Sequence, residues 1–491
     1  MKRSPSNGVS ASGGWGLSAF TPDDLGRLHE ASLEVIENTG VLVEACEEAF
    51  EIFASAGARV ERQGADALIK VPASVVEECL RSAPRAVVLK GRIAAADYAL
   101  DPHRVTFAPM GELVQIVDLT DGTLRPTTRQ DSADITLLCD SLDEVGVMHR
   151  PVASLDKPAG LHPIFNAESL FANTGKHVFI GPGDAANLAA IARIAFAHVG
   201  GAEEFARRPI FTAIVAPVSP LTMGKDCAEM IIASAKLDGG GIVCAPAIVG
   251  GATGPVTVAG SLVCTNVEFL SGLILAQLVR RGTRVVYANS SAMMELRTGN
   301  HAYGAPEMGM IDAASTRLAQ HYGLPNLVSA FPSGGKVADP QMGYESAMNG
   351  LLAALAGANV VNGLGALEFG LTFDYAKFML DVDCARMIRA ILAGIPLTDE
   401  QLALDVIAEV GPGGQYLSHK HTSRHMRERS QAKLFDRQSR HAWSRQATPD
   451  LVERAREQAR AVLATHQPPP VSDATRAEVE EIIAELVAGQ A

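Results

Sequence analysis

The chain has 491 residues, and its 42 Lys and Arg against 55 Asp and Glu give a net charge of 42 − 55 = −13. Hydrophobic residues make up 47% and charged residues 20% of the sequence, close to an average globular protein. This composition excludes a disordered chain, a collagen-like fibre and a small disulfide scaffold. The acidic balance argues against nucleic acid as a partner, because a general nucleic-acid binder needs a basic face.

Signals of export and of membrane insertion are not apparent in the sequence. The stretch Met1–Gly8 contains basic residues but no apolar core after them, so we expect no secretory signal. No window offers about 18 uninterrupted apolar residues, so we expect no membrane partner. The seven cysteines are scattered and form no CxxC pair, which is typical of reduced thiols. The sequence therefore predicts a cytoplasmic protein.

The first 98 residues divide into two parts. Residues 1–20 are rich in Ser and Gly and are predicted to be a disordered N-terminus. The run Thr21-Pro22-Asp23-Asp24 then predicts a helix start. Thr can cap free backbone N–H groups, Pro suits the first turn, and acids favour the positive end of the helix dipole. Residues 21–98 are expected to form a mostly helical cap with a strand or two.

From about residue 100, short β-branched apolar runs alternate with longer helical stretches. This alternation indicates parallel strands joined by right-handed crossovers. Eight units in about 300 residues fit a (β/α)8 TIM barrel of the α/β class over residues 99–400, with an open doubly wound sheet as the alternative. The eight runs are Val105–Ala108, Val145–His149, His177–Ile180, Ile210–Val215, Ile242–Ala245, Arg284–Ala288, Asn326–Ala330 and Asn359–Asn362.

Residues 401–491 are predicted to form a C-terminal helical extension. Residues 420–460 hold eleven Lys and Arg against five Asp and Glu, a net charge of +6 within an acidic chain. A last helix with one apolar face follows the candidate capping box Thr475-x-x-Glu478. We expect that face to pack on the body or on a neighbouring subunit, so a homo-oligomer stays open.

Several familiar motifs are absent. Gly334-Gly335-Lys336-Val337 fails the GxxxxGK[ST] pattern of a phosphate-binding loop, and no GxGxxG opens a helix, so ATP and NAD are not expected. His419, His421 and His425 lie close together, but Lys420 and neighbouring arginines would repel a cation. We therefore predict no metal site.

Chemistry in a barrel enzyme lies on the loops that follow the strands. In this chain those loops lack a GxSxG elbow and a Cys–His pair, but they carry Glu112, Glu307 and Glu368 among glycines, amides and a few aromatic residues. Such a mouth suits a cationic small molecule that is held rather than attacked covalently. Each acid could equally serve a salt bridge or a helix cap, and each aromatic residue could serve packing.

Over nearly its whole length the chain resembles the trimethylamine methyltransferase family of corrinoid-protein-dependent enzymes. The resemblance rests on several segments that occur in this order. They are Leu28–Val41, Tyr303–Glu307, Leu351–Asn359 with Asn362–Gly365, Leu367–Thr372, and Tyr416–Thr422.

The resemblance implies a (β/α)8 barrel that transfers a methyl group from a methylated amine to cobalt. The cobalamin would be supplied by a separate corrinoid protein, with no cofactor bound tightly to this chain. The best-known trimethylamine enzymes carry pyrrolysine on a late barrel loop, whereas the nearest stretch here, Phe331–Lys336, has ordinary residues. Family members without pyrrolysine are associated with quaternary amines such as glycine betaine. A quaternary ammonium also leaves as a neutral amine, so it needs no covalent helper.

The expected site follows from the loops and from the resemblance. Glu307 and Glu368 match family segments and are the expected catalytic acids near the ammonium. Tyr303 and Phe331 are expected as walls for the cation. The remaining candidates are Asn289, His149 and Arg150 for a substrate carboxylate, and Gly334, Gly335 and Lys336 for docking of the corrinoid protein.

Other functions stay open at the level of sequence. A trimethylamine enzyme stays an alternative, and no sequence feature separates the expected methyltransferase from a non-catalytic barrel that binds methylated amines. A barrel lyase or aldolase would need a Schiff-base lysine, and Lys336 is the loop lysine that fits.

Overall fold

The computed structural model describes residues 9–10, 20–101, 104–428, 430, 432–445 and 450–489. The disorder predicted for residues 1–20 therefore falls almost entirely outside the described residues. Within that stretch, strand β1 (Val9–Ser10) pairs antiparallel with strand β7 of the barrel.

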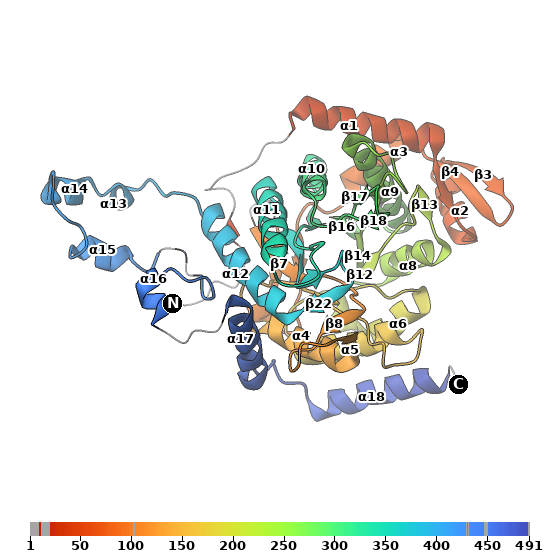
Figure 1. Cartoon of the computed structure of the whole chain (residues 1–491). Coiled ribbons are helices and arrows are strands. Elements are labelled where there is room, and N and C mark those ends of the chain that lie inside the picture. The colour runs from red at the N-terminus through yellow and green to blue at the C-terminus, as the bar shows by residue number, and fades with distance from the viewer. Residues whose placement is uncertain are drawn as a thin grey trace.

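Eight parallel strands form a nearly closed barrel at the centre of the molecule (Figure 1). Their order is β7-β20-β19-β16-β14-β12-β11-β10, and a parallel bridge between Phe107 and Val145 leads back to β7. The closure confirms the predicted TIM barrel, because an open sheet would leave two edge strands. The strands are β7 (Arg104–Pro109), β10 (Met148–His149), β11 (Val178–Ile180), β12 (Phe211–Val215), β14 (Gly241–Cys244), β16 (Arg284–Asn289), β19 (Asn326–Ser329) and β20 (Val360–Leu364).

A ring of helices covers the outside of the barrel (Figure 1). Each of the predicted crossovers contains a helix. The ring consists of α4 (Arg129–Asp140), α5 (His162–Asn173), α6 (Ala185–Val199), α8 (Lys225–Lys236), α9 (Val258–Val279), α10 (Pro306–Tyr322), α11 (Pro340–Ala356) and α12 (Tyr375–Leu392).

A hairpin of β5 (Val87–Leu89) and β6 (Tyr98–Leu100) fills one end of the barrel. Its buried apolar side chains share one cluster with strand residues such as Phe179 and Val286. Tyr98 packs against Gly146 at the start of the second strand, which places the hairpin at the N-terminal ends of the strands. The opposite end, where barrel enzymes carry their chemistry, is left to the loops.

The N-terminal region holds more strand than predicted. Thr21 caps the first helix as predicted, and it also forms a capping box with Asp24. Three strands form a small antiparallel sheet in the order β2-β4-β3. Strand β13 (Thr222–Met223), which follows barrel strand β12 in the chain, pairs parallel with β2 and adds a fourth strand to this sheet. The elements are α1 (Pro22–Glu34), a π-helical turn (Val35–Thr39), β2 (Val41–Val43), α2 (Glu47–Ser55), β3 (Arg59–Gln63), β4 (Asp66–Lys70) and α3 (Ala73–Ser82).

Helix α9 is long and apolar enough to cross a membrane by length and composition. However, 78% of its most apolar window is buried inside the protein. The helix packs against α1, α2, α3, α8 and α10. Its apolar character is therefore explained by burial between the barrel and the N-terminal region.

After α12 the chain makes an excursion away from the barrel and returns as α17 and α18 (Figure 1). Helix α17 packs on α12, and α18 packs on α6. The predicted capping box at Thr475 is wrong, because the Ser472 hydroxyl accepts the Thr475 N–H at 3.1 Å and starts the helix earlier. The elements are α13 (Asp399–Leu402), α14 (Leu404–Val410), α15 (Lys420–His425), α16 (Arg440–Ser444), α17 (Leu451–Thr465) and α18 (Asp473–Ala488).

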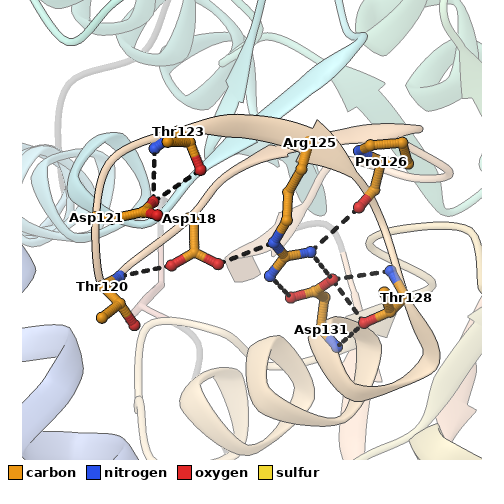
Figure 2. Close-up of polar contacts among 8 residues, drawn as sticks. All are labelled: Asp118, Thr120, Asp121, Thr123, Arg125, Pro126, Thr128 and Asp131. Carbon is orange, nitrogen blue, oxygen red and sulfur yellow. Dashed lines mark hydrogen bonds and ion pairs between the residues drawn. The ribbon is translucent and has the colours of Figure 1, made fainter.

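Figure 2 shows the polar contacts that fasten the hairpin of β8 (Gln115–Val117) and β9 (Leu124–Pro126) to helix α4. Arg125 donates to both carboxylate oxygens of Asp131, at 2.7 and 2.8 Å, and to Asp118 at 2.8 Å. Asp131 also forms a capping box with Thr128 at the start of α4. Strand β8 of this hairpin also pairs parallel with β22 (Thr372–Asp374), which follows the last barrel strand. These contacts therefore support the loops that follow the first and the last barrel strands.

Replacement Asp131→Ala removes the buried end of this ion pair and the carboxylate half of the capping box at the start of α4. We expect the midpoint of thermal unfolding to fall by about 2–4 °C, measured by calorimetry. Asp121→Ala, at the exposed tip of the same hairpin (Figure 2), is the matched control and should leave the midpoint nearly unchanged. Equal shifts in the two variants would contradict this account of the hairpin.

Candidate active site

An aromatic and thioether cluster lies at the C-terminal ends of the barrel strands. Tyr303 and Met308 are buried in it, and Met110 and Phe369 pack against them. The Tyr303 hydroxyl donates to the Ser290 carbonyl at 2.8 Å, which fixes the ring beside the end of β16. Met110 follows β7, Tyr303 follows β16 and Phe369 follows β20, so the barrel brings together residues far apart in sequence. We call Met110, Tyr303, Met308 and Phe369 the mouth cluster.

Two of the loops at this end are joined through their backbones. The Glu368 N–H donates to the Gly335 carbonyl at 2.8 Å, and the Phe369 N–H donates to the Ser333 carbonyl at 3.0 Å. Glu368 and Phe369 both have left-handed backbones, with φ of +53° and +58°. Adjacent non-glycine residues rarely adopt this conformation, and such strain gathers at functional sites.

Glu345 of α11 holds the glycine loop in place. Its carboxylate accepts the Ser333 hydroxyl at 2.6 Å and the Gly334 N–H at 2.8 Å. A side chain at Gly304 would collide with the same carboxylate, so the loop that carries Tyr303 also lies against Glu345. Glu345 therefore sets the relative position of Tyr303 and the loop Ser333–Lys336.

A buried ion pair underlies both loops. Lys377 donates to Asp381 at 2.5 Å, to the Phe331 carbonyl at 3.1 Å and to the Ser346 hydroxyl at 3.0 Å. Asp381 also accepts the Gly365 N–H at 2.9 Å, although burial raises the pKa of its carboxyl. The pair thus ties the ends of β19 and β20 to helices α11 and α12.

The two predicted acids lie on elements next to the mouth cluster. Glu368 is half-buried, and its carboxylate accepts the Thr372 hydroxyl at 2.9 Å. Glu307 is half-buried in the first turn of α10, directly before the buried Met308. Both acids are therefore adjacent in sequence to a residue of the mouth cluster, Met308 for Glu307 and Phe369 for Glu368.

His149 and Arg150 come together at the end of β10. The His149 Nδ1 lies 3.2 Å from the Asn362 amide nitrogen, and the ring packs on Gly111. Burial lowers the pKa of His149 to about 4, so the imidazole is neutral at pH 7. Arg150 forms an ion pair with Glu112, and burial lowers the pKa of its guanidinium to about 9.

The side chains of Asn289 and Phe331 are not placed with the mouth cluster. The Asn289 amide donates to the fully buried carboxylate of Asp312 on α10, at 2.7 Å. Phe331 is fully buried, packs edge-on against Phe107 with ring centroids 5.7 Å apart, and lies against Gly350 of α11. Both side chains therefore face the helix layer.

The predicted docking residues Gly334, Gly335 and Lys336 lie at the edge of the mouth cluster. Lys336 is exposed, donates to the Gly334 carbonyl at 2.7 Å, and places its Nζ 4.2 Å from the centre of the Phe369 ring. This exposed position does not offer the apolar burial that activates a Schiff-base lysine.

Sequence reasoning missed several residues of this site. Phe369 lies inside one of the segments that carry the resemblance, so that segment was the available signal. The buried pair Lys377 and Asp381 has the ordinary i, i+4 spacing of a surface ion pair. Nothing local distinguishes Glu345 from a solvated helix residue. Among the residues that the structure describes, no group of three His, Cys, Asp or Glu could hold a metal ion.

A TIM barrel with an aromatic and thioether cluster at its mouth is typical of small-molecule enzymes. Comparison with known proteins specifies the family, because the model of the trimethylamine methyltransferase family (MTTB) matches residues 15–489. A trimethylamine methyltransferase MttB of Desulfitobacterium hafniense is 40% identical, over 97% of this chain and 96% of that protein. The trimethylamine methyltransferase MttB2 of Methanosarcina mazei is 35% identical, over 97% of this chain and 96% of that protein. A glycine betaine methyltransferase of Desulfitobacterium hafniense is 30% identical, over 95% of this chain and 96% of that protein. The chain belongs to the trimethylamine methyltransferase family and is a methyltransferase.

The low pKa of His149 predicts a pH effect on stability. The pKa of this imidazole falls from 6.5 to about 4 on burial, so below about pH 6.5 the unfolded chain binds the proton more readily. The folded protein therefore loses stability as the pH falls from about 6.5 to about 4. We expect the difference in melting temperature between the wild type and His149→Asn to change over this range, with the wild type falling more. Parallel melting curves would contradict a neutral, buried His149.

Proposed function

We propose that this methyltransferase moves a methyl group from a quaternary methylated amine of the glycine betaine type to the cobalt(I) of a corrinoid. A separate corrinoid protein supplies the cobalamin, so we expect no tightly bound cofactor in this chain. The names of the relatives support methylated amines as donors, since they include both trimethylamine and glycine betaine methyltransferases.

The observation that carries the proposal is the composition of the mouth cluster. Tyr303 and Phe369 offer aromatic rings and Met110 and Met308 offer thioethers, all of them polarizable groups that attract a diffuse cation weakly. Glu307 and Glu368 add carboxylates on neighbouring elements. A trimethylammonium group fits such surroundings because its charge is spread over methyl groups that donate no strong hydrogen bond.

Weak binding of the cation also suits the reaction. The methyl carbon forms a bond to cobalt with the cobalt electron pair, while the carbon–nitrogen pair stays on nitrogen. The amine therefore leaves neutral, and the positive charge at nitrogen disappears during the step. A site that bound the charge tightly would stabilise the substrate more than the transition state and slow the transfer. The task of the protein is to orient the donor and exclude water.

The surface around the mouth supports the docking of a protein partner. Large apolar side chains are exposed on five of the loops that follow barrel strands, at 49–65% of their full area. Gly334, Gly335 and Lys336 lie on one of these loops, between β19 and α11, and we propose that they take part in docking. The basic segment 420–460 is a second docking surface under this proposal, because charge complementarity speeds association with an acidic partner. The exposed apolar side chains are Val218, Val256, Leu296, Val337 and Leu371.

The seven cysteines are all free thiols, which supports a reducing compartment such as the cytoplasm. Cobalt(I) is itself a strong reductant, so the reaction needs reducing surroundings. Trimethylamine is the second candidate donor, favoured by the 40% identity to an enzyme named for it. The ordinary residues of Phe331–Lys336 favour the quaternary amine instead.

The test is a methyl-transfer assay under anaerobic, reducing conditions. Purified protein is mixed with cob(I)alamin and, in separate reactions, with trimethylamine, glycine betaine, proline betaine or carnitine, and methylcobalamin is followed by its spectrum. Methylation by a quaternary amine and not by trimethylamine is the expected result. No methylation by any donor, repeated with a cognate corrinoid protein, would leave a non-catalytic binding barrel as the better account.

Removal of one ring should weaken substrate binding. Tyr303→Leu takes the ring from the mouth cluster, and we expect a loss of about 5- to 30-fold in affinity for the quaternary amine, measured by titration calorimetry. Tyr303→Phe keeps the ring and removes only the hydrogen bond to Ser290, so it is the matched control and should change affinity by less than about threefold. Equal losses in the two variants would indicate that the hydroxyl, not the ring, matters.

A further inference from the structure

The ammonium group of Lys336 occupies an unusual position beside the mouth cluster. It lies 4.2 Å from the centre of the Phe369 ring and donates to the backbone carbonyl of Gly334. In the described part of the chain no carboxylate lies within 4 Å of it. Its direct contacts are therefore a ring and a peptide carbonyl, and the exposed side chain is free to take an anionic ligand.

Three other basic groups at this end of the barrel are not available to an anion. Arg150 is almost fully buried and paired with Glu112. Lys377 is fully buried and paired with Asp381. His149 is neutral at pH 7, because burial lowers the pKa of its imidazole to about 4. Of these four groups, Lys336 alone is exposed and forms no ion pair with a described carboxylate.

The backbone next to Lys336 is held by hydrogen bonds, although the side chain is exposed. Glu345 fixes the backbone of Gly334 through its carboxylate, and the Gly335 carbonyl accepts the Glu368 N–H. The side chain is four methylenes long, so the ammonium can move from the Gly334 carbonyl to a ligand while staying at the edge of the mouth cluster. This arrangement fixes a positive charge next to the rings that would receive a methylated ammonium.

That charge has opposite effects on two kinds of amine. A plain cation on Phe369 and Tyr303 is repelled by the nearby Lys336 ammonium. A zwitterion that carries a carboxylate a few bonds from its nitrogen places the negative end against Lys336 and the positive end on the rings. The distance between Lys336 and Phe369 therefore favours a donor with both charges.

We propose that Lys336 binds the carboxylate of a zwitterionic quaternary amine and is the residue that excludes quaternary amines lacking a carboxylate. This inference rests on the proposed function and specifies its donor. It assigns to Lys336 the carboxylate contact that the sequence suggests for Asn289, His149 and Arg150, whose side chains are neutral or already paired. Lys336 is here a binding residue and takes no part in the transfer step.

The test compares glycine betaine with choline, which has the same trimethylammonium group and a hydroxyl in place of the carboxylate. Titration calorimetry gives both affinities for the wild type, Lys336→Met and Lys336→Arg. Met keeps the length of the side chain and removes its charge, whereas Arg keeps the charge. We expect the wild type to prefer glycine betaine at least tenfold, Lys336→Met to lose most of that preference, and Lys336→Arg to keep it.

Two further readouts separate a charge effect from a structural one. The preference for glycine betaine should weaken between about 50 mM and about 500 mM salt in the wild type and not in Lys336→Met, because salt screens exposed charges. The melting temperatures of the three proteins should agree, since Lys336 is exposed. A lower melting temperature in Lys336→Met with an unchanged preference would overturn the inference.

The outcomes also distinguish this inference from the proposed function. Equal binding of choline and glycine betaine by the wild type, or an unchanged preference in Lys336→Met, overturns the role of Lys336 even where methyl transfer from glycine betaine to cobalamin is observed. A preference that depends on Lys336, without methyl transfer from any donor, overturns the proposed function and leaves the binding role in place. Methyl transfer from trimethylamine alone overturns both.

Discussion

The buried pair of Lys377 and Asp381 is the interaction on which the candidate site depends. Two charges inside the helix layer are costly, and they are stabilised only because each is also hydrogen bonded. Through the Phe331 carbonyl and the Gly365 N–H, the pair fixes where β19 and β20 end. The loops that begin there carry Lys336 and Phe369, so the geometry of the mouth follows from a contact that the substrate never touches.

The candidate site is characterised by the placement of its rings and sulfur atoms more than by acids, bases or nucleophiles. The mouth cluster offers rings and sulfur atoms, and its acids are half-buried and lightly bonded. A methyl group on a quaternary nitrogen needs no acid, base or covalent nucleophile to leave, because the product amine is neutral. The proposed quaternary donor therefore requires mainly that the rings are well placed, and the left-handed backbones of Glu368 and Phe369 place one of them.

Much of the fold could be predicted from the sequence, and the site only in part. All eight predicted runs are barrel strands, because fully buried parallel strands read as short apolar runs. The loops at the mouth carry Tyr303, Glu368 and Lys336, where the sequence predicts them. In contrast, the side chains of Asn289 and Phe331 lie in the helix layer. The sequence predicts that a residue lies at the end of a strand. Whether its side chain faces the mouth or the helix layer depends on the local twist and hydrogen bonding of that strand end.

The sequence by itself determined the strand and helix alternation, the helix cap at Thr21 and the family, since each rests on local patterns or on residue identity. Only the tertiary structure decided which side chains meet at the mouth. The register of β20 against β7 shifts between Val361 and Leu364, directly before the loop that holds Glu368 and Phe369, and no local sequence pattern predicts such a shift. The contact of Lys336 with Phe369 joins two loops about 30 residues apart, so no spacing rule along the chain could have shown it.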